Sequence, residues 1–448
     1  MICLEYMESK YLTRAFWALA FLLLLTACVG RPMPAPKPPA SFSLVAPTPT
    51  ARPAGDSLLV IGRFVGDDEV LMRELLKEFT NQSGVEVAYQ GDGEVAKLLQ
   101  QQIKGGRTPD VLLLPKAHWL REMASAEAIP PLSDEVAAAV EAHFSEAWLD
   151  LVTYGGYIYG VPFDANAKSL LWYRPDALEK VGRGPPETLE ELFELAHELE
   201  AQGEVAFVVP GGAGWLLSDW FENVLLASTG TQLYDDLIAH RVAWTNPAVE
   251  AAAQEYLSLL RDPWVMGGSQ EAATLPLNFE SFARAFDPSQ AGAAMWLGQG
   301  SIANSFAAQK NLLAEETYDL FPFPANGSMI VIGSVAVGTN SRAETMALLN
   351  FLAQPEAVEP WVKAGGFISP NHDLPLDTYP TKVARQEAEL LASAQRFRTD
   401  LSDRLPPNLG FPFFGDQLRE MLKRPDDLPS ILAEIEKVAI REQGAAPK

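Results

Sequence analysis

Residues 57–114 alternate between strand and helix signals, and this order restricts the fold more than any other feature of the sequence. Continuous apolar runs at residues 58–61 and 111–114 are typical of buried parallel strands, and the alternation over residues 85–89 indicates a strand between them. The intervening helices are indicated by apolar residues at three- and four-residue spacing, namely Met72, Leu75, Leu76 and Phe79, then Val95, Leu98, Leu99 and Ile103. The strand–helix–strand–helix–strand order predicts a doubly wound α/β sheet.

The 448-residue chain is too long for one simple core, which predicts two lobes. Gly155-Gly156 has the character of a hairpin turn, and Gly160-Val161-Pro162 that of a strand leaving the first lobe. An apolar, β-rich run returns at residues 329–338 and indicates that the chain crosses back there. We expect the first lobe at residues 57–163 and 319–366, and the second at 164–318 and 367–448.

The N-terminus predicts export and membrane attachment. Basic residues precede an apolar run at residues 15–25, which is too short for a stable membrane span and is typical of a signal peptide. The run ends in Leu25-Thr26-Ala27-Cys28, which is similar to the lipobox of bacterial lipoproteins, where the chain is cut ahead of an acylated cysteine. We expect a signal peptide at residues 1–27 and lipidation of Cys28 on the outer face of the bacterial cell membrane. The alternative is an uncleaved anchor with an incidental cysteine.

Residues 28–56 are rich in Pro and Ala and have almost no apolar periodicity. Such a stretch favours extended polyproline conformation at about 3.1 Å per residue, so it is predicted to be a tether. The chain has 2 Cys, and Cys3 would leave with the signal peptide. With Cys28 acylated, no disulfide, thiolate catalysis or cysteine-ligated metal is expected.

Charge and motif content argue against several functions. The net charge of −24 disfavours nucleic acid and anionic membrane surfaces, because both need clustered Lys and Arg. The 5 His are scattered without metal-ligand spacing, and neither a Gly-x-Ser-x-Gly elbow nor a Gly-x-x-x-x-Gly-Lys phosphate loop is present. We therefore expect no enzyme activity, metal or cofactor. A carboxylate pair of a tethered glycoside hydrolase stays open as an alternative, since the chain has 58 Asp and Glu.

Four segments, in this order, resemble the extracellular solute-binding proteins of bacterial ABC importers, family 1, which includes maltose- and α-glucoside-binding proteins. They are residues 79–87, 105–111, 156–173 and 186–192. In the last of these, Thr188 would cap a helix and Glu191 would complete a capping box.

The α-glucoside branch of that family is resembled by residues 218–223 and 398–406 in particular. The similarity extends over essentially residues 57–440. Some positions depart from the family pattern: Arg174 stands where Asn is frequent, Asn223 where Asp is frequent, and Leu114-Pro115-Lys116-Ala117 lacks a usual glycine. These departures concern the identity of the ligand more than the fold.

The resemblance implies a two-lobed periplasmic-binding-protein fold (type II), with a ligand cleft between lobes that are joined by hinge strands and close by hinge motion. It also implies an ABC permease and an ATPase as partners. We expect a monomer that captures a carbohydrate, an α-glucoside or oligosaccharide, and delivers it to the permease. A polyol or polyamine is the alternative ligand.

A sugar site needs aromatic rings for the C–H faces and carboxylates or amides for the hydroxyls. Trp215, Asp219 and Trp220 lie within six residues and could supply both kinds of group. Groups that follow the first strand or the crossover are also expected at a cleft, since α/β folds place ligand groups at strand carboxyl ends. The predicted ligand residues are Asp67, Asp68, Asp164, Asn166, Trp172, Trp215, Asp219, Trp220, Trp296 and Phe367.

Six of these candidates have a structural alternative. Asp67, Asp68 and Asp219 could cap helices, and Trp172, Trp215 and Trp296 could be core residues instead of ligand contacts. Three further tryptophans are assigned to core packing from the outset, namely Trp148, Trp244 and Trp264.

Overall fold

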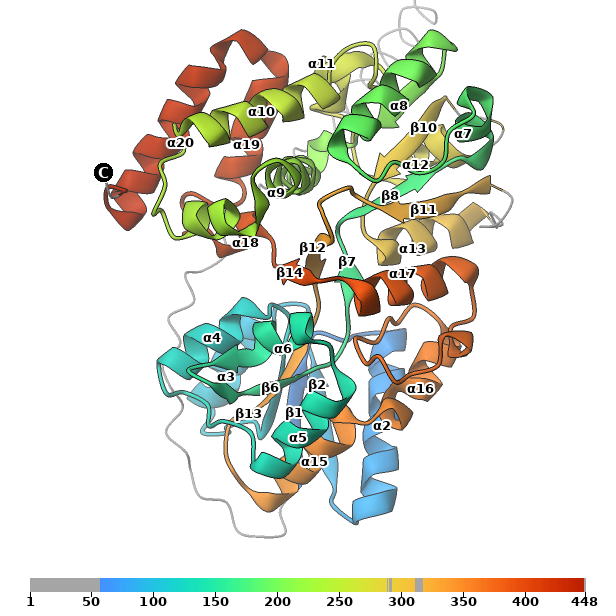
Figure 1. The fold of residues 1–448 in the computed structure, drawn as a ribbon. Helices are drawn as coiled ribbons and strands as arrows, with labels where there is room; N and C mark the ends of the chain where they lie inside the picture. Colours follow the sequence, from blue (N-terminus) through green and yellow to red (C-terminus); the bar gives the residue numbers. More distant parts are fainter. Residues whose placement is uncertain (1–56, 288, 290–291, 311–316, 447–448) are drawn as a thin grey trace, which may run out of the picture. The chain divides into compact units, whose positions relative to one another are not determined.

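The computed structural model describes residues 57–287, 289, 292–310 and 317–446 (Figure 1). The predicted signal peptide, Cys28 and the predicted tether lie outside these residues. Among the described residues, no helix has both the length and the apolar character needed to span a membrane.

The first lobe is built on a five-stranded sheet with the order β2-β1-β3-β13-β6. Its strands are β1 (Leu58–Gly62), β2 (Val87–Gly91), β3 (Val111–Leu114), β6 (Gly160–Pro162) and β13 (Val335–Gly338). Strands β1, β2 and β3 are parallel, whereas β13 runs antiparallel to both β3 and β6. The helices of this lobe are α2 (Asp67–Ser83), α3 (Val95–Lys104), α4 (His118–Ser125), α5 (Asp134–His143), α6 (Glu146–Val152), α15 (Ala343–Ala353) and α16 (Pro355–Ala364).

The predicted order of strands and helices at the start of the first lobe is confirmed. Every residue of β1 is buried, and α2 buries the four apolar residues whose spacing predicted it. Gly84 ends α2 with φ 73°, the left-handed conformation that glycine adopts without a steric penalty.

The second lobe is built on a four-stranded sheet with the order β11-β8-β10-β9. Its strands are β8 (Leu170–Tyr173), β9 (Val205–Val208), β10 (Ala293–Leu297) and β11 (Asp319–Pro322). Its helices include α7 (Pro175–Val181), α8 (Leu189–Ala201), α9 (Trp215–Ile238), α10 (Pro247–Leu259), α12 (Phe279–Phe286), α13 (Gly300–Lys310), α19 (Phe413–Lys423) and α20 (Leu428–Gln443). The capping box predicted from Thr188 and Glu191 is present at the start of α8.

A third, three-stranded sheet lies between the two larger ones in Figure 1, in the order β14-β12-β7. Its strands are β7 (Asn166–Ala167), β12 (Ser328–Ile332) and β14 (Arg396–Arg398). The chain runs through β7 when it leaves the first lobe and through β12 when it returns, so we call this the hinge sheet. The hairpin predicted at Gly155-Gly156 is also present, as β4 (Thr153–Tyr154) paired with β5 (Tyr157–Ile158).

The chain returns to the first lobe later than residue 319, where the sequence placed the return. Strand β11 pairs with β8 in the second sheet, with Asp319 opposite Tyr173 and Phe321 opposite Leu171. The first sheet resumes only at β13. The apolar residues of β11 made it look like the start of the returning run, but they are buried against the second lobe.

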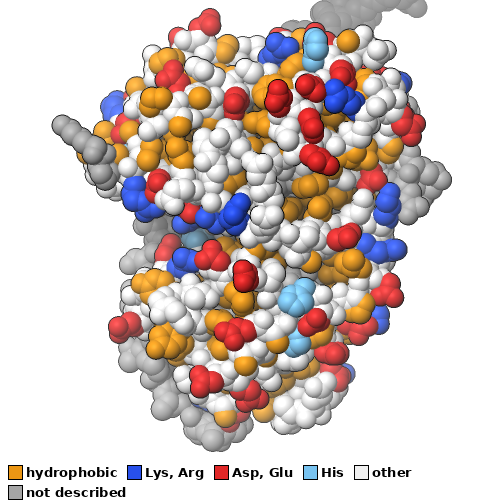
Figure 2. Space-filling view, viewed as in Figure 1, with side chains coloured by type: hydrophobic (Ala, Val, Ile, Leu, Met, Phe, Trp, Pro, Cys, Tyr) orange, Lys and Arg blue, Asp and Glu red, His pale blue; other side chains and the backbone are white. Residues whose placement is uncertain are grey.

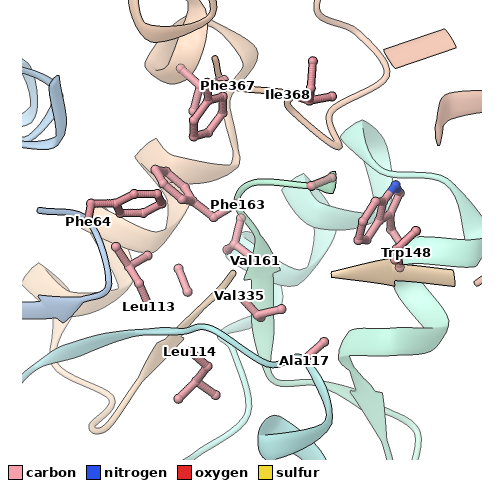
Figure 3. Close-up of a cluster of buried hydrophobic side chains, with 14 of the residues drawn as sticks. Phe64, Leu113, Leu114, Ala117, Trp148, Val161, Phe163, Val335, Phe367 and Ile368 are labelled. Atoms are coloured by element: carbon pink, nitrogen blue, oxygen red, sulfur yellow. The ribbon is translucent and has the colours of Figure 1, made fainter. Parts of the chain in front are cut away.

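The other boundary, predicted at residue 367, also lies further along the chain. Phe367 packs edge-on against Phe163 with ring centroids 5.4 Å apart, and Figure 3 shows both rings near Phe64 of the first lobe. The backbone N–H of Ala165 donates to the carbonyl of Ile368 at 2.9 Å. The segment around residues 367–368 therefore belongs to the core beneath the first lobe's crossing strands.

Candidate functional site

Arg63, which follows β1, joins the first lobe to two crossing segments. Its guanidinium pairs with the buried carboxylate of Asp164, and its Nε donates to Ser334 Oγ at 3.0 Å. The backbone N–H of Ser334 donates to Asp164 Oδ1 at 2.8 Å. Asp164 precedes β7 and Ser334 precedes β13, so one arginine fixes the carboxyl end of β1 to both crossings. The side chain of Arg63 keeps 36% of its surface exposed, so it is partly accessible to a ligand.

Asp67 and Asp68 lie exposed in the first turn of α2. The N-cap of α2 is Gly66, and among the described residues the structure shows no side-chain hydrogen bond that caps this helix. Helix capping therefore does not explain the presence of Asp67 and Asp68. The pKa of Asp68 is raised, mainly by partial burial, with Asp164 and Asp67 adding to the shift and Arg63 opposing it. Asp68 and Asp164, predicted separately from the sequence, thus lie in one electrostatic group around Arg63.

A buried charge cluster lies at the other end of β7. Lys168 Nζ is 2.7 Å from Asp219 Oδ1 and 2.5 Å from Asp400 Oδ2, and all three residues are buried. The indole of Trp215 completes the group, with its ring centroid 5.1 Å from Lys168 Nζ. A cation over an indole face is favourable, and more so where water is excluded.

Glu222 ties this cluster to the segment that follows β14. Its carboxylate accepts hydrogen bonds from the backbone N–H of Leu401 at 2.8 Å and of Ser402 at 3.1 Å. The hydroxyl of Tyr234 donates to the same carboxylate at 2.8 Å. Burial raises the pKa of Glu222, Asp219 and Asp400, neighbouring carboxyls add to the shift, and the ammonium group of Lys168 opposes it.

The ion pair of Lys116 with Asp403 connects the two lobes directly. Lys116 follows β3 of the first lobe, and Asp403 lies in α18 (Leu401–Arg404). Lys116 Nζ is 2.8 Å from Asp403 Oδ1, and each side chain is about one-third exposed. The groups at the carboxyl ends of β1 and β3 therefore both reach across to the hinge or to the second lobe.

The predicted aromatic residues divide into one partly exposed ring and four buried ones. Trp215 is partly exposed at the start of α9, whereas Trp172, Trp220 and Trp296 have no accessible surface and Phe367 is nearly buried. Trp172 donates its indole N–H to the carbonyl of Gly298 at 2.8 Å, and Trp220 packs against Phe207. This burial argues against ligand contact by these four rings and for the core alternative. Trp148, Trp244 and Trp264 are buried, as predicted.

The structure brings several predicted polar residues close to β7. Asn166 lies in β7 itself, opposite Ile332 of β12, and is partly exposed. Asp164 lies before β7, while Asp219 meets it through Lys168. Sequence reasoning missed Arg63, Lys168 and Asp400. The only signal for Asp400 was the resemblance of residues 398–406 to the α-glucoside branch.

Residues 66–359 match the family described as "Bacterial extracellular solute-binding protein". The α-glucosides-binding periplasmic protein AglE of Rhizobium meliloti (strain 1021) is 28% identical over 375 residues, which cover 80% of this chain and 81% of the relative. The osmoprotective compounds-binding protein GgtB of Synechocystis sp. is 27% identical over 362 residues, which cover 78% of this chain and 85% of the relative.

Solved structures agree on the fold. The bacterial solute receptor AcbH superposes with a TM-score of 0.75 at 17% identity, covering 87% of this chain and 100% of AcbH. The sugar-binding protein MalE of Xanthomonas citri gives a TM-score of 0.67 at 17% identity, covering 86% of this chain and 96% of MalE. The expected two-lobed periplasmic-binding-protein fold is thereby confirmed. With a matching family region that includes β2 to α15 and a fold shared along nearly the whole described chain, this protein belongs to the bacterial extracellular solute-binding proteins.

Proposed function

We propose that this protein captures a carbohydrate between its lobes and delivers it to the permease of an ABC importer. The observation that carries the proposal is the placement of two groups at opposite ends of β7, in a chain of this family. Arg63, Asp68 and Asp164 lie at the first-lobe end, and Lys168, Asp219 and Trp215 at the second-lobe end. A ligand held along β7 would contact both lobes and favour their closure.

The chemistry of these groups suits a sugar. The exposed face of an indole matches the C–H face of a pyranose, while carboxylates and a guanidinium accept and donate to its hydroxyls. Among the predicted ligand residues, we propose Asp68, Asn166 and Trp215 as direct contacts, with Asp164 acting through Arg63 and Asp219 through Lys168. Asp67 is adjacent to them and exposed.

The names of the relatives support a carbohydrate or a small osmolyte. AglE is named for α-glucosides, AcbH for a preference for galactopyranose, and GgtB for osmoprotective compounds. An α-glucoside is therefore the first ligand to test, and a polyol is the second, because GgtB is among the most similar relatives. We propose further that the chain acts as a monomer without enzymatic activity and is held at the membrane by a lipid on Cys28.

Calorimetric titration of the full chain, purified in mild detergent, tests the proposal. Maltose, trehalose, sucrose and longer α-glucosides are titrated first, then polyols and polyamines, and each sugar is analysed for cleavage afterwards. Saturable one-to-one binding of an intact sugar is expected. Heat from polyols or polyamines alone would contradict the carbohydrate proposal, and cleavage of a sugar would overturn the binding-protein function.

Trp215→Ala is expected to weaken the affinity for the sugar by about tenfold, since one aromatic contact contributes on the order of 1 kcal/mol or more. Calorimetry measures the change. Tyr157→Ala is the matched control, because Tyr157 is 64% exposed in the β4–β5 hairpin and is not among the proposed ligand residues. Equal affinity of Trp215→Ala and the unmodified protein would remove Trp215 from the site.

Trp220→Phe separates core packing from ligand contact. Because Trp220 has no accessible surface, the smaller ring is expected to lower the free energy of unfolding by about 1–2 kcal/mol while the sugar affinity stays within about twofold. Chemical denaturation and calorimetry on the same preparation measure both quantities. A large loss of affinity without a loss of stability would return Trp220 to the ligand site.

A further inference from the structure

A pocket of about 360 Å³ lies where the two lobes meet beside β14. The first lobe contributes His118 and Arg121 of α4 and Asp150 of α6. The hinge sheet and second lobe contribute Arg398 of β14, Arg404 of α18, Asp235 of α9 and Arg241, which follows α9. We call it the arginine pocket. Figure 2 shows Lys and Arg side chains, interspersed with Asp and Glu, at mid-height on the left, where Figure 1 places α18.

The arginine pocket is separate from the site proposed for the carbohydrate. None of the ten predicted ligand residues is among those that line it. In the hinge sheet, β14 forms one edge and β7 the other, with β12 between them. The arginine pocket therefore borders the edge of the hinge sheet opposite to Asn166. A ligand bound there would not occupy the proposed carbohydrate site.

The guanidinium groups of the pocket have too few carboxylate partners. Arg398 Nη2 lies 2.8 Å from Asp235 Oδ2, and Arg404 Nη1 lies 3.5 Å from the other oxygen of the same carboxylate. Two arginines thus share one aspartate. The Nε of Arg398 is buried and has no hydrogen-bond partner within the part of the chain that the structure describes. A buried donor without an acceptor costs free energy, so the Arg398 side chain would gain from a rearrangement that brings Nε to an acceptor.

The other two arginines each have a carboxylate partner of their own. Arg121 lies 3.5 Å from the exposed carboxylate of Asp150, a distance at the long end for an ion pair. Arg241 pairs with Asp236 at 2.6 Å, outside the lining of the pocket. Counting Asp236, three carboxylates stand against the four guanidinium groups of the lining, which leaves a surplus of one positive charge. A positive surplus at one place is notable on a chain with a net charge of −24, and it attracts anions.

His118 adds a hydrogen-bonding group without adding charge. Burial lowers the pKa of His118 to about 4, and the nearby Lys116 lowers it further while Asp403 opposes the shift. The imidazole is therefore neutral at pH 7 and offers one donor and one acceptor. A neutral imidazole beside guanidinium groups can bind a protonated as well as an ionised oxygen of an oxyanion.

We propose that the arginine pocket binds a small, doubly charged oxyanion of the phosphate class. Planar guanidinium groups bind phosphate oxygens through paired N–H···O bonds, which a fully solvated halide cannot match. Arg121 belongs to the first lobe, whereas Arg398 and Arg404 belong to the hinge sheet and the second lobe. The bound anion would contact all three and favour the lobe arrangement in which they converge.

Calorimetric titration of inorganic phosphate into the full chain in mild detergent tests this inference, in a buffer free of phosphate and sulfate at pH 7. Saturable one-to-one binding is expected, and it is measured without sugar, so it does not depend on the carbohydrate proposal. Arg398→Gln and Arg121→Gln are each expected to weaken phosphate binding by about tenfold or more, since each removes a charged hydrogen-bonding group.

Controls separate a specific site from general attraction. Arg183→Gln is matched in charge, since Arg183 pairs with Glu194 and Glu198 on the second lobe away from the pocket, and its phosphate affinity should not change. Arg121 is 45% exposed, so its replacement tests the pocket even if Arg398→Gln fails to fold. The absence of saturable binding, equal weakening by Arg183→Gln, or equal binding of chloride at the same ionic strength would overturn the proposal. Tighter binding of a dicarboxylate than of phosphate would overturn the assignment of its chemical class.

Discussion

Lys168→Met is expected to lower the free energy of unfolding by about 3–5 kcal/mol at pH 7. Lys168 is the cation nearest to the buried carboxyls of Asp219 and Asp400, and Asp219 has no accessible surface. Burial alone would lower the pKa of Lys168, but the carboxyls outweigh it and raise the pKa, so the ammonium form is held firmly. Without the ammonium group, these carboxyls must either remain charged in a dry core or take up protons.

Chemical denaturation of the purified variants measures this loss. Lys180→Met is the matched control, since Lys180 is about half exposed beside Glu204 and its removal is expected to cost less than about 1 kcal/mol. Changing Asp219 and Asp400 to Asn in the Lys168→Met background should recover part of the stability, because the uncompensated charges are then gone. If Lys168→Met lowered the free energy of unfolding as little as Lys180→Met, the ammonium group of Lys168 would not be needed to balance the buried carboxyls.

Glu387→Gln is expected to remove about 3 kcal/mol of pH dependence from the stability of the protein. Glu387 lies in α17 (Lys382–Ser393), where its Oε1 accepts the backbone N–H of Ala167 in β7 at 3.1 Å. Its Oε2 is buried without a partner among the described residues, and a side chain at Gly300 would collide with it. Burial raises the pKa of Glu387 from 4.5 to about 7, with the Ala167 hydrogen bond opposing the shift.

The direction of this effect follows from proton binding. Between pH 4.5 and 7 the folded protein holds a proton on Glu387 that the unfolded chain has released. The stabilisation from this group is therefore complete below pH 4.5 and is lost as the pH rises towards 7. Denaturation of the unmodified protein and Glu387→Gln at several pH values measures the difference. Glu389→Gln, on the exposed side of the same helix, is the control, and equal pH profiles for Glu387→Gln and Glu389→Gln would contradict the prediction.

The fold was largely predictable because many of its helices and strands are indicated by local sequence patterns. Residues 57–114 carried unbroken apolar runs and helical periodicity, and Thr188 with Glu191 formed the expected capping box. The return to the first lobe was predicted too early, at residue 319, because the sequence of an apolar strand such as β11 does not indicate which sheet the strand joins. Only pairing partners decide between sheets, and these lie far away in the sequence.

The candidate site was less predictable because it depends on long-range approach. Lys168 and Asp400 are 232 positions apart, so nothing local indicates that one buries its charge against the other. Tryptophans were predicted as ligand residues because aromatic rings suit a sugar. The sequence pattern does not show whether an aromatic ring in α9 or β10 faces a cleft or the core. Trp215 and Trp220 illustrate this, since five positions on one helix separate a partly exposed ring from a fully buried one.

The position of β13 has a consequence for how the chain folds as it is made or exported. This strand lies between β3 and β6 in the first sheet, although residues 163–334 separate it from β6 along the chain. The strands of the second sheet, by contrast, all lie between residues 170 and 322. When the chain emerges from its N-terminus, the second sheet can therefore close before the first one can. Strands β3 and β6 each lack a neighbour until residue 338 has emerged, and during that interval the open edge of the apolar strand β3 needs protection from aggregation.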